Sequence, residues 1–215
     1  VTRQDDVVNL TLSATLTYGD LTTTKSFEVS TAPIDIMDYL LFDFEDNLDE
    51  KLFDAGSGTI VGPQFSEGGS ANYRDGFVVK DGVLGKAFYF DGNTGIKLPD
   101  NLINSYEYSI SFWINPEQLT VHTPAFYGAI NRENWMSILP YGWDNNALVW
   151  STSGGAWFDG VSGVPLSIGE WVHYTITVDN GLMNFYLNGG LVGSKAGLAD
   201  LFTEANDSIF SLGVN

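Results

Sequence analysis

Two Asn-Gly pairs, about one strand length apart, constrain the fold of this chain more than any other feature. They stand at positions 180–181 and 188–189 of the stretch VHYTITVDNGLMNFYLNGGLVGS. Asn and Gly adopt positive φ angles at low cost, as tight hairpin turns require, and the segments between the pairs have the length of strands. The stretch therefore predicts three antiparallel strands in a meander.

The composition extends this prediction to most of the chain. Of the 215 residues, 44% are apolar, so a sizeable core can be buried, and 24 glycines separate runs rich in Val, Ile, Thr, Phe and Tyr. Nine basic against 27 acidic residues give a net charge of −18, which disfavours nucleic acid and anionic membrane surfaces as partners. There is no cysteine for disulfides or thiolate metal sites, and no apolar run has the length of a membrane span.

Residues 7–30 predict a hairpin that is separate from the rest of the chain. VVNLTLSATLTY alternates apolar and polar residues, Gly19-Asp20 can turn the chain, and TTTKSFEVS can return as a second strand. STAP, which ends at Pro33, predicts a linker. We therefore expect one unit over 1–33 and a second unit over 34–215.

The second unit predicts many short strands divided by turns, a spacing that favours a sandwich or jelly roll. Only LADLFTEA, residues 198–205, is expected to form a helical turn. The predicted strands are DYLLFDFE, KAFYFDG, GIKLPD, YSISFWINP, AFYGAI, WMSILPY, ALVWSTS, WVHYTITVD, LMNFYLN, LVGSK and SIFSLGV.

Four segments of the second unit carry recurrent motifs, namely LLFDFEDNLDE, GKAFYFDGNTGIKLPD, YSISFWINPEQ and GEWVHYTITVDNGLMNFYLNGGLVGS. In this order they resemble the opening strand, the Gly-x-Ala-x-x-Phe-Asp-Gly hairpin, the Ser-Ile-Ser-x-Trp-Ile-x-Pro strand and the Trp-x-His strand with its following hairpin in laminin-G-like domains. These domains belong to the concanavalin A-like lectin/glucanase superfamily. The resemblance covers residues 38–215 and implies an all-β, concanavalin A-like jelly-roll sandwich, while motifs of this structural kind imply little about function.

The N-terminal segment VTRQDDVVNLTLSATLTYGDLTTTKSFEVSTAP resembles the last strands of an atrophied bacterial immunoglobulin-like module. Such modules accompany laminin-G-like domains in secreted glycoside hydrolases, notably those that degrade arabinan and arabinoxylan. The pairing implies a noncatalytic carbohydrate-binding module of such an enzyme, extracellular or at a bacterial cell surface. Its partners would be a plant cell-wall polysaccharide or oligosaccharide and neighbouring modules of the same polypeptide. The alternative is a structural spacer or protein-interaction domain that binds no sugar.

A β-glycanase is a further alternative, because the superfamily includes β-glucanases. Their Glu-x-Asp-x-x-Glu strand places two carboxylates at the glycosidic bond. The nearest run here, FEDNLDE, has adjacent acids instead, so we do not expect catalysis. The two histidines support neither a metal site nor a Ser-His-Asp site. His173, in an alternating strand, is expected to be hydrogen-bonded in a core or half-buried position.

The resemblance also implies a structural calcium ion. Relatives hold Ca²⁺ with oxygen ligands from the first strand, the Phe-Asp-Gly hairpin and the last strand, and this hard cation takes several carboxylate and carbonyl oxygens. The matching residues here are Asp43, Glu45 and Asp91. Solvated surface charge is an equal alternative for these residues in a chain with 27 acids.

Four of the six tryptophans lie within residues 135–157. In WMSIL, Met136 and Ile138 share a face that should pack against the opposing sheet, which turns Trp135 outward. In ALVWS, Leu148 and Trp150 share a face that matches an apolar pair of the family, so Trp150 is expected in the core. Two further tryptophans match structural positions of the family and are also expected in the core, Trp113 and Trp171.

The remaining tryptophans predict a sugar-binding surface. Aromatic rings have apolar faces that suit the C–H faces of sugars, and neighbouring polar side chains can bind hydroxyl groups. The alternative is that these rings pack beneath long loops, since tryptophan is usually well buried. The predicted ligand-binding residues are Trp135, Trp143, Trp157, Tyr141, Asn131, Arg132, Asn134 and Asp144.

Both ends of the chain are expected to be incomplete. The N-terminal hairpin supplies too few strands to enclose an immunoglobulin-like core, and any export signal is expected outside this chain. SIFSLGVN resembles a family strand that is followed by one more strand, which pairs beside the opening strand. An open or otherwise filled slot is therefore expected beside residues 39–45.

Overall fold

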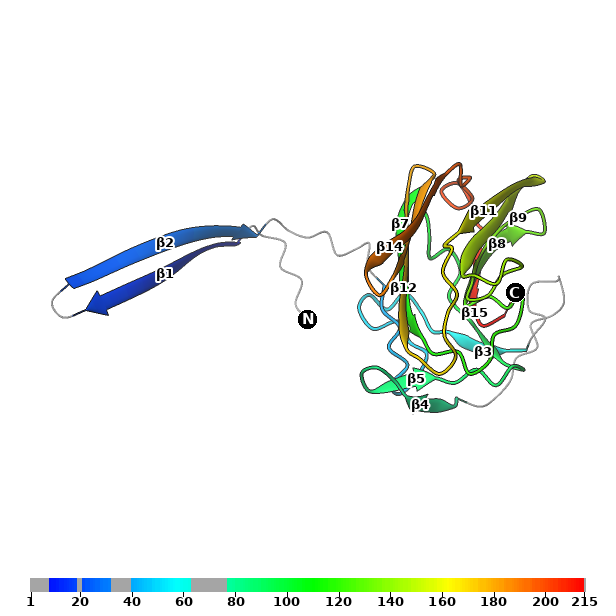
Figure 1. Cartoon of the computed structure of the whole chain (residues 1–215), viewed down its shortest axis with the longest axis horizontal. Helices are drawn as coiled ribbons and strands as arrows, with labels where there is room; N and C mark the ends of the chain where they lie inside the picture. Colours follow the sequence, from blue (N-terminus) through cyan, green and yellow to red (C-terminus); the bar gives the residue numbers. More distant parts are fainter. Residues whose placement is uncertain (1–7, 19–20, 32–39, 63–76, 215) are drawn as a thin grey trace. The chain divides into compact units, whose positions relative to one another are not determined.

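The computed structural model describes residues 8–18, 21–31, 40–62 and 77–214, in two compact units, Val1–Leu40 and Leu41–Asn215 (Figure 1). The first unit contains the antiparallel strands β1 (Val8–Tyr18) and β2 (Leu21–Thr31), which confirms the predicted pair of strands. The turn at 19–20 and the end of the linker at 32–33 lie outside the described residues. The likeness to an immunoglobulin-like module and the boundary after residue 33 stay predictions.

The second unit consists mainly of two antiparallel sheets stacked face to face (Figure 1). The seven-stranded sheet has the order β11-β10-β9-β8-β15-β6-β3 and the four-stranded sheet the order β14-β13-β12-β7. The strands of the larger sheet are β3 (Thr59–Val61), β6 (Gly95–Lys97), β8 (Phe126–Asn131), β9 (Asn134–Leu139), β10 (Leu148–Ser153), β11 (Ala156–Val161) and β15 (Ile209–Leu212). Those of the smaller sheet are β7 (Glu107–Ile114), β12 (Val172–Asp179), β13 (Leu182–Leu187) and β14 (Gly190–Ala196). A separate short hairpin joins β4 (Val79–Asp81) to β5 (Lys86–Phe88).

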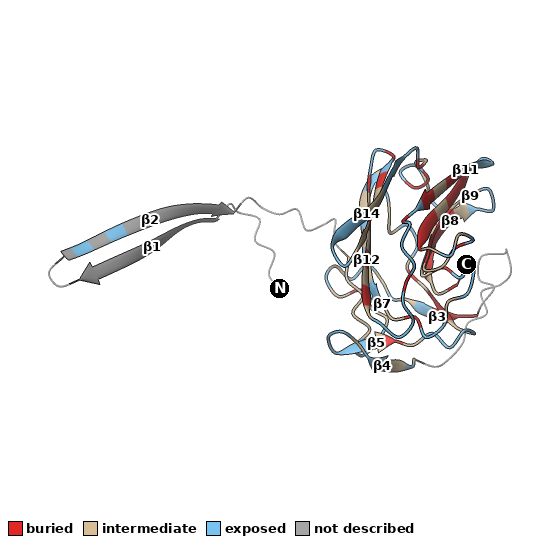
Figure 2. Ribbon diagram, viewed as in Figure 1, coloured by how far each residue is buried: buried red, intermediate tan, exposed pale blue. Residues whose placement is uncertain are grey.

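One apolar core fills the space between the two sheets (Figure 2). In β12, buried and half-buried residues alternate from Val172 to Val178, so every second side chain enters the core. From the opposite sheet, Met136, Ile138 and Phe210 enter the same core and are fully buried. The arrangement confirms the predicted all-β, concanavalin A-like jelly-roll sandwich.

Residues 40–45 form no strand, so the prediction for DYLLFDFE is wrong there. The cause is Glu50, a buried residue whose carboxylate accepts a hydrogen bond from the backbone N–H of Leu41 at 2.9 Å. The carbonyl of Leu41 in turn accepts from the N–H of Lys51 at 2.8 Å. The prediction of an open or filled slot beside residues 39–45 assumed a strand there. Residues 40–45 form no such strand, and residue 39 lies outside the described residues.

Smaller departures from the predicted elements have local causes. LADLFTEA forms a turn, with the N–H of Ala205 donating to the carbonyl of Phe202 at 3.1 Å, and no helix. Strands β3 and β4 have three residues each, too few for alternation to reveal them. Strand β11 was not among the predicted strands, and it forms one edge of the seven-stranded sheet. No helix among the described residues is long and apolar enough to cross a membrane.

Candidate functional site

Four tryptophans gather on the outer face of the seven-stranded sheet, and we call them the tryptophan cluster. Trp150 is central, with ring centroids 4.9 Å from Trp135, 5.2 Å from Trp143 and 5.1 Å from Trp157. The rings of Trp150 and Trp157 are stacked with 18° between their planes, while the other two meet Trp150 edge to face. The three tryptophans that were predicted to face a ligand are thus brought together around a fourth.

The strand register places these rings on one face. Trp135 of β9 lies opposite Thr152 of β10, and Thr152 lies opposite Trp157 of β11. Trp150 stands two residues before Thr152, so its side chain leaves the sheet on the same side. Met136 and Ile138, on the opposite face of β9, enter the core, which confirms the predicted orientation of this strand.

The prediction that Trp150 belongs to the core is wrong. In β10 it is Val149 that enters the core, and Trp150 is half-buried on the outer face. Leu148 shares this outer face and is nevertheless fully buried, because the loop after β9 covers it. A Cβ atom added to Gly142 in that loop would lie 2.0 Å from the Leu148 side chain. The apolar pair of β10 therefore faces away from the sandwich core.

Two loops hold the cluster at one end of the sheet. The ring of His122 stacks on Trp150 at 5.3 Å and meets Trp143 edge-on at 6.1 Å. The N–H of His122 donates to the carbonyl of Tyr141 at 3.3 Å, and the Tyr141 hydroxyl is hydrogen-bonded to the side chain of Asn145. His122 has a φ of 68°, which is uncommon for a residue with a side chain. Its role in the cluster carries no signal in the sequence.

The cluster is too exposed to be part of a core. Trp157 is 60% exposed and Trp143 is 44% exposed, while Trp135 and Trp150 are half-buried. A contiguous apolar patch at a protein surface is typical of an interaction site. Tryptophan also carries an indole N–H that can bind a polar ligand group while the ring faces pack on its apolar parts.

The polar residues predicted to accompany the cluster mainly shape its loops. Asn131 accepts hydrogen bonds from the Glu133 N–H at 2.9 Å and from Asn134 at 3.0 Å, and Arg132 is exposed in the same turn. Asn134 accepts from the N–H of Gly154 at 3.1 Å and so joins the β8–β9 turn to the β10–β11 turn. Asn131, Arg132 and Asn134 lie in or beside the β8–β9 turn, just before Trp135 in the sequence.

Two acidic residues lie next to cluster rings. Asp144 follows Trp143 in the loop, and its carboxylate accepts from the N–H of Asn146 at 3.1 Å. Asp159 lies opposite Trp150 in the register of β10 and β11 and therefore on the same face. Its carboxylate has no hydrogen-bond or ion-pair partner within the part of the chain that the structure describes, so it can accept hydrogen bonds from a ligand. Asp159 was not predicted, because no strand was expected over residues 156–161.

The three predicted calcium ligands have separate partners. Asp43 forms an ion pair with Lys51 at 3.5 Å, and Glu45 accepts from the backbone N–H of Lys86 at 2.9 Å. The carboxylate of Asp91 accepts hydrogen bonds from a backbone N–H and a threonine hydroxyl of its own turn, which lower its pKa. No group of three or more His, Asp or Glu side chains among the described residues is arranged to hold a metal. Calcium binding stays a prediction.

The last two tryptophans also reach the surface, so their predicted core positions are wrong. Trp113 is 49% exposed on the outer face of β7, with its ring centroid 4.9 Å from that of His173 on β12. Trp171 is half-buried just before β12. The prediction for His173 is confirmed, since it is half-buried and its Nε2 lies 2.9 Å from the Ser111 hydroxyl.

Fold and sequence together define the class of this protein. Residues 90–215 match the family model of the concanavalin A-like lectin/glucanases superfamily, and the chain belongs to this superfamily. Among solved structures it is similar to domain 4 of AbnA, a GH43 extracellular arabinanase from Geobacillus stearothermophilus, in complex with arabinotriose. The two are 40% identical, with a TM-score of 0.74 over 80% of each chain.

Two other solved structures show weaker likenesses to the chain. The carbohydrate-binding module CBM66 from Bacillus subtilis is 12% identical, with a TM-score of 0.39 over 64% of this chain and 84% of that one. A SAP-like pentraxin from Limulus polyphemus is 12% identical, with a TM-score of 0.44 over 75% of this chain and 66% of that one. These two likenesses are too weak to bear on function. No curated protein sequence matches the chain.

Proposed function

We propose that the Leu41–Asn215 unit is a noncatalytic carbohydrate-binding module of a secreted glycoside hydrolase, and that the tryptophan cluster is its sugar-binding surface. The observation that carries the proposal is the position of four tryptophans on the outer face of a sheet instead of in the core. The 40% identity to an arabinanase domain in complex with arabinotriose supports arabinan as the ligand, with arabinoxylan next.

The geometry of the cluster suits a chain of neutral sugars. The exposed rings extend from the loop that carries Trp143, across Trp150, to Trp157 on the edge strand β11. Their faces offer apolar area with few rotatable bonds, so little side-chain entropy is lost on binding. The unpartnered carboxylate of Asp159 can accept hydrogen bonds from hydroxyl groups, and bonds to a charged acceptor are the stronger kind.

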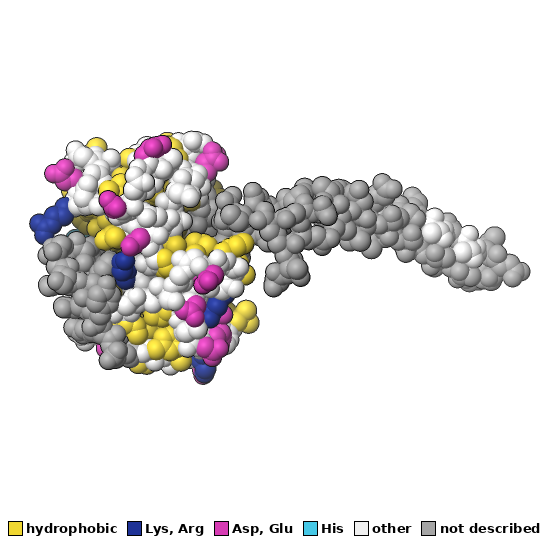
Figure 3. Space-filling model, turned by 180° about the vertical axis from the view of Figure 1, so that it is seen from behind, with side chains coloured by type: hydrophobic (Ala, Val, Ile, Leu, Met, Phe, Trp, Pro, Cys, Tyr) yellow, Lys and Arg dark blue, Asp and Glu magenta, His cyan; other side chains and the backbone are white. Residues whose placement is uncertain are grey.

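The charge of the protein favours a neutral ligand. With a net charge of −18, the chain repels anionic polymers. On the face shown in Figure 3, acidic side chains are spread among apolar patches, and basic side chains do not gather into one area. Neutral plant polysaccharides carry no charge to be repelled.

A catalytic role is disfavoured by the lowered pKa values of three carboxyl groups that line one pocket of this unit. A glycosidase needs a general acid with a raised pKa. Hydrogen bonds from Lys86 lower the pKa of Asp81, those of its own turn lower the pKa of Asp91, and those from Lys80 lower the pKa of Glu117. A spacer, the other alternative, would have scattered exposed aromatic residues, whereas four tryptophans here are in mutual contact.

The proposed role is to hold a catalytic module of the same polypeptide near its substrate. A tether converts the second encounter into an intramolecular one and raises the effective concentration of the enzyme, so that weak sugar binding at one site suffices. The extracellular arabinanase that contains the similar domain supports a secreted location for this module.

Affinity electrophoresis tests the proposal with gels that contain arabinan, arabinoxylan, xylan or galactan. We expect arabinan to retard the protein, Trp157→Ala to reduce the retardation without a change in Tm, and Ile168→Ala to keep it in full. Ile168 is a matched control, because both side chains are 60% exposed. Unchanged mobility of the wild type in all four gels would overturn the proposal, and equal retardation of both variants would exclude the cluster as the site.

A further inference from the structure

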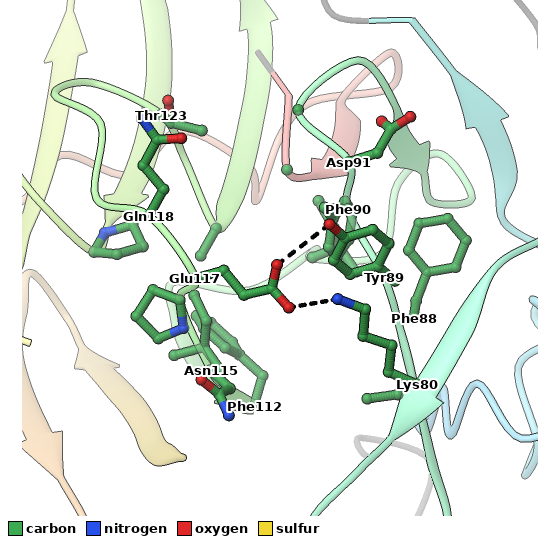
Figure 4. A pocket seen from close by; sticks show the side chains of 18 of the residues that line it. Lys80, Phe88, Tyr89, Phe90, Asp91, Phe112, Asn115, Glu117, Gln118 and Thr123 are labelled. Atoms are coloured by element: carbon green, nitrogen blue, oxygen red, sulfur yellow. Dashed lines mark hydrogen bonds and ion pairs between the residues drawn. The ribbon is translucent and has the colours of Figure 1, made fainter. Parts of the chain in front are cut away.

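A pocket of about 450 Å³ lies apart from the tryptophan cluster (Figure 4). It is bordered by the β4–β5 hairpin, the end of β7 with the loop that follows, and Trp171, and none of the four cluster tryptophans lines it. Ligand pockets typically have volumes of about 300–1,000 Å³. The pocket is therefore large enough for a small ligand, and the proposed function does not account for it.

Aromatic side chains form much of its wall. Trp113 and Trp171, the two tryptophans outside the cluster, both line the pocket, and Trp113 is 49% exposed. Phe88 and Phe90 meet edge to face at 4.8 Å on the hairpin side. Phe44 also lines the pocket and has a φ of 58°, a costly conformation for a bulky residue. Such strain is often found at ligand sites.

The pocket also contains hydrogen-bonding capacity that the protein does not use. The side-chain oxygen of Asn115 is buried and lacks a hydrogen-bond partner within the described residues. Buried polar atoms without partners are rare and costly. Rotation of the side-chain amide exchanges its oxygen and nitrogen, so Asn115 can offer an acceptor or a donor to a ligand. Gln118 and Thr123 lie on the same side of the pocket as each other, across from the β4–β5 hairpin (Figure 4).

The charges around the pocket exclude an anionic ligand. Asp81, Asp91 and Glu117 line it together with one basic residue, Lys80. Lys80 is bound to the Glu117 carboxylate, and its ammonium group lies 3.5 Å from the centre of the Tyr89 ring. This arrangement fixes the rim and leaves no unpaired cation for a phosphate, sulfate or carboxylate among the described residues that line the pocket. An aromatic wall with amide and hydroxyl groups suits a neutral polyhydroxylated ligand.

We propose that this pocket is a second carbohydrate site, which takes a monosaccharide or disaccharide unit of a neutral glycan between Trp113, Trp171 and Asn115. The sugar that we assign to this pocket rests on the proposed function, but binding of a sugar in the pocket does not require the tryptophan cluster. With both sites on one module, the protein contacts a polysaccharide at two places, and its apparent affinity for the polymer exceeds its affinity for a short oligosaccharide.

Fluorine NMR of the full chain labelled with 5-fluorotryptophan separates the two sites. Six tryptophans give six resonances, which single Trp→Phe variants assign to the pocket pair and to the cluster. Arabinotriose and xylotriose are the probes. We expect arabinotriose to shift both groups, Trp157→Ala to weaken only the cluster response, and Asn115→Leu to weaken only the pocket response, by about tenfold for one lost hydrogen bond.

The Asn115→Leu variant also distinguishes a binding role from a structural one. Because the Asn115 oxygen is unpaired in the free protein, its removal should leave Tm unchanged or raise it. Gln118→Ala, at an exposed position of the wall, serves as a second variant and should weaken the pocket response in the same way.

Each outcome of the titration decides one question. A silent pocket pair at arabinotriose and xylotriose concentrations that saturate the cluster overturns the second site, as does a pocket response that neither variant weakens. A responsive pocket with a silent cluster supports the second site and contradicts the proposed role of the cluster. Silence of all six resonances with both sugars contradicts both proposals.

Discussion

Replacement of Glu50 by Gln should lower the free energy of unfolding of the Leu41–Asn215 unit by about 3 kcal/mol at neutral pH. Glu50 is 5% exposed, and one carboxylate oxygen accepts from the N–H groups of Leu41 and Leu52, both at 2.9 Å. The other oxygen accepts from Phe53 at 2.6 Å and from Ala55 at 3.5 Å. A hydrogen bond to a charged group contributes about 1.5–3 kcal/mol. Gln puts an NH₂ group where one oxygen was, which removes the short Phe53 bond and weakens the rest.

The effect should depend on pH in a defined direction. Burial alone would raise the pKa of Glu50, but the backbone hydrogen bonds from Leu41, Phe53, Leu52 and Ala55 outweigh it and the pKa is lowered. A carboxyl group with a lowered pKa in the folded state stabilises the fold above its unfolded pKa, which is about 4.5. This stabilisation is lost as the pH falls through the folded pKa. The difference between wild type and Glu50→Gln should therefore be full at pH 7 and shrink below about pH 4.5.

Urea unfolding followed by tryptophan fluorescence measures this difference, with Glu204→Gln as the control at an exposed acid. For a unit of this size, about 3 kcal/mol corresponds to a Tm lower by about 6–12 °C. The reasoning is refuted if Glu50→Gln is as stable as the wild type at pH 7, or if the difference stays constant as the pH falls.

Two further predictions concern the metal and the centre of the cluster. If calcium binds as the family resemblance predicts, excess Ca²⁺ should raise the Tm of EDTA-treated protein, and Asp91→Asn should reduce that rise. An unchanged Tm in a calcium titration would contradict calcium binding. Trp150→Ala should reduce retardation in arabinan gels and also cost about 2 kcal/mol of stability, unlike Trp157→Ala, because Trp150 is half-buried among three other tryptophans. Differential scanning calorimetry compares the two variants, and equal Tm values would contradict a central packing role.

The sequence by itself determined most of the strands and, in the most regular of them, which side chains face inward. In β12 the alternation from Val172 to Val178 requires the apolar side chains to share one face, and the Asn-Gly pairs fix the neighbouring turns at 180–181 and 188–189. The same alternation placed Met136 inward and Trp135 outward. Trp135 could be predicted in this way, because a local period of two residues is a property of the chain itself. Trp143 and Trp157 were predicted only because the other tryptophans had been assigned to structural positions.

Only the tertiary structure decided which residues are buried by segments outside their own strand. Leu148 and Trp150 share a face in any strand, but the loop between β9 and β10 covers Leu148 and made that face resemble an inner one. In the same way Glu50, by accepting backbone hydrogen bonds from Leu41 and beyond, replaced a predicted strand with a loop. The pocket brings Trp113 and Trp171 together from elements far apart in sequence. Contacts between distant segments leave no periodic trace in a sequence, because burial depends on what covers a side chain as well as on the strand that carries it.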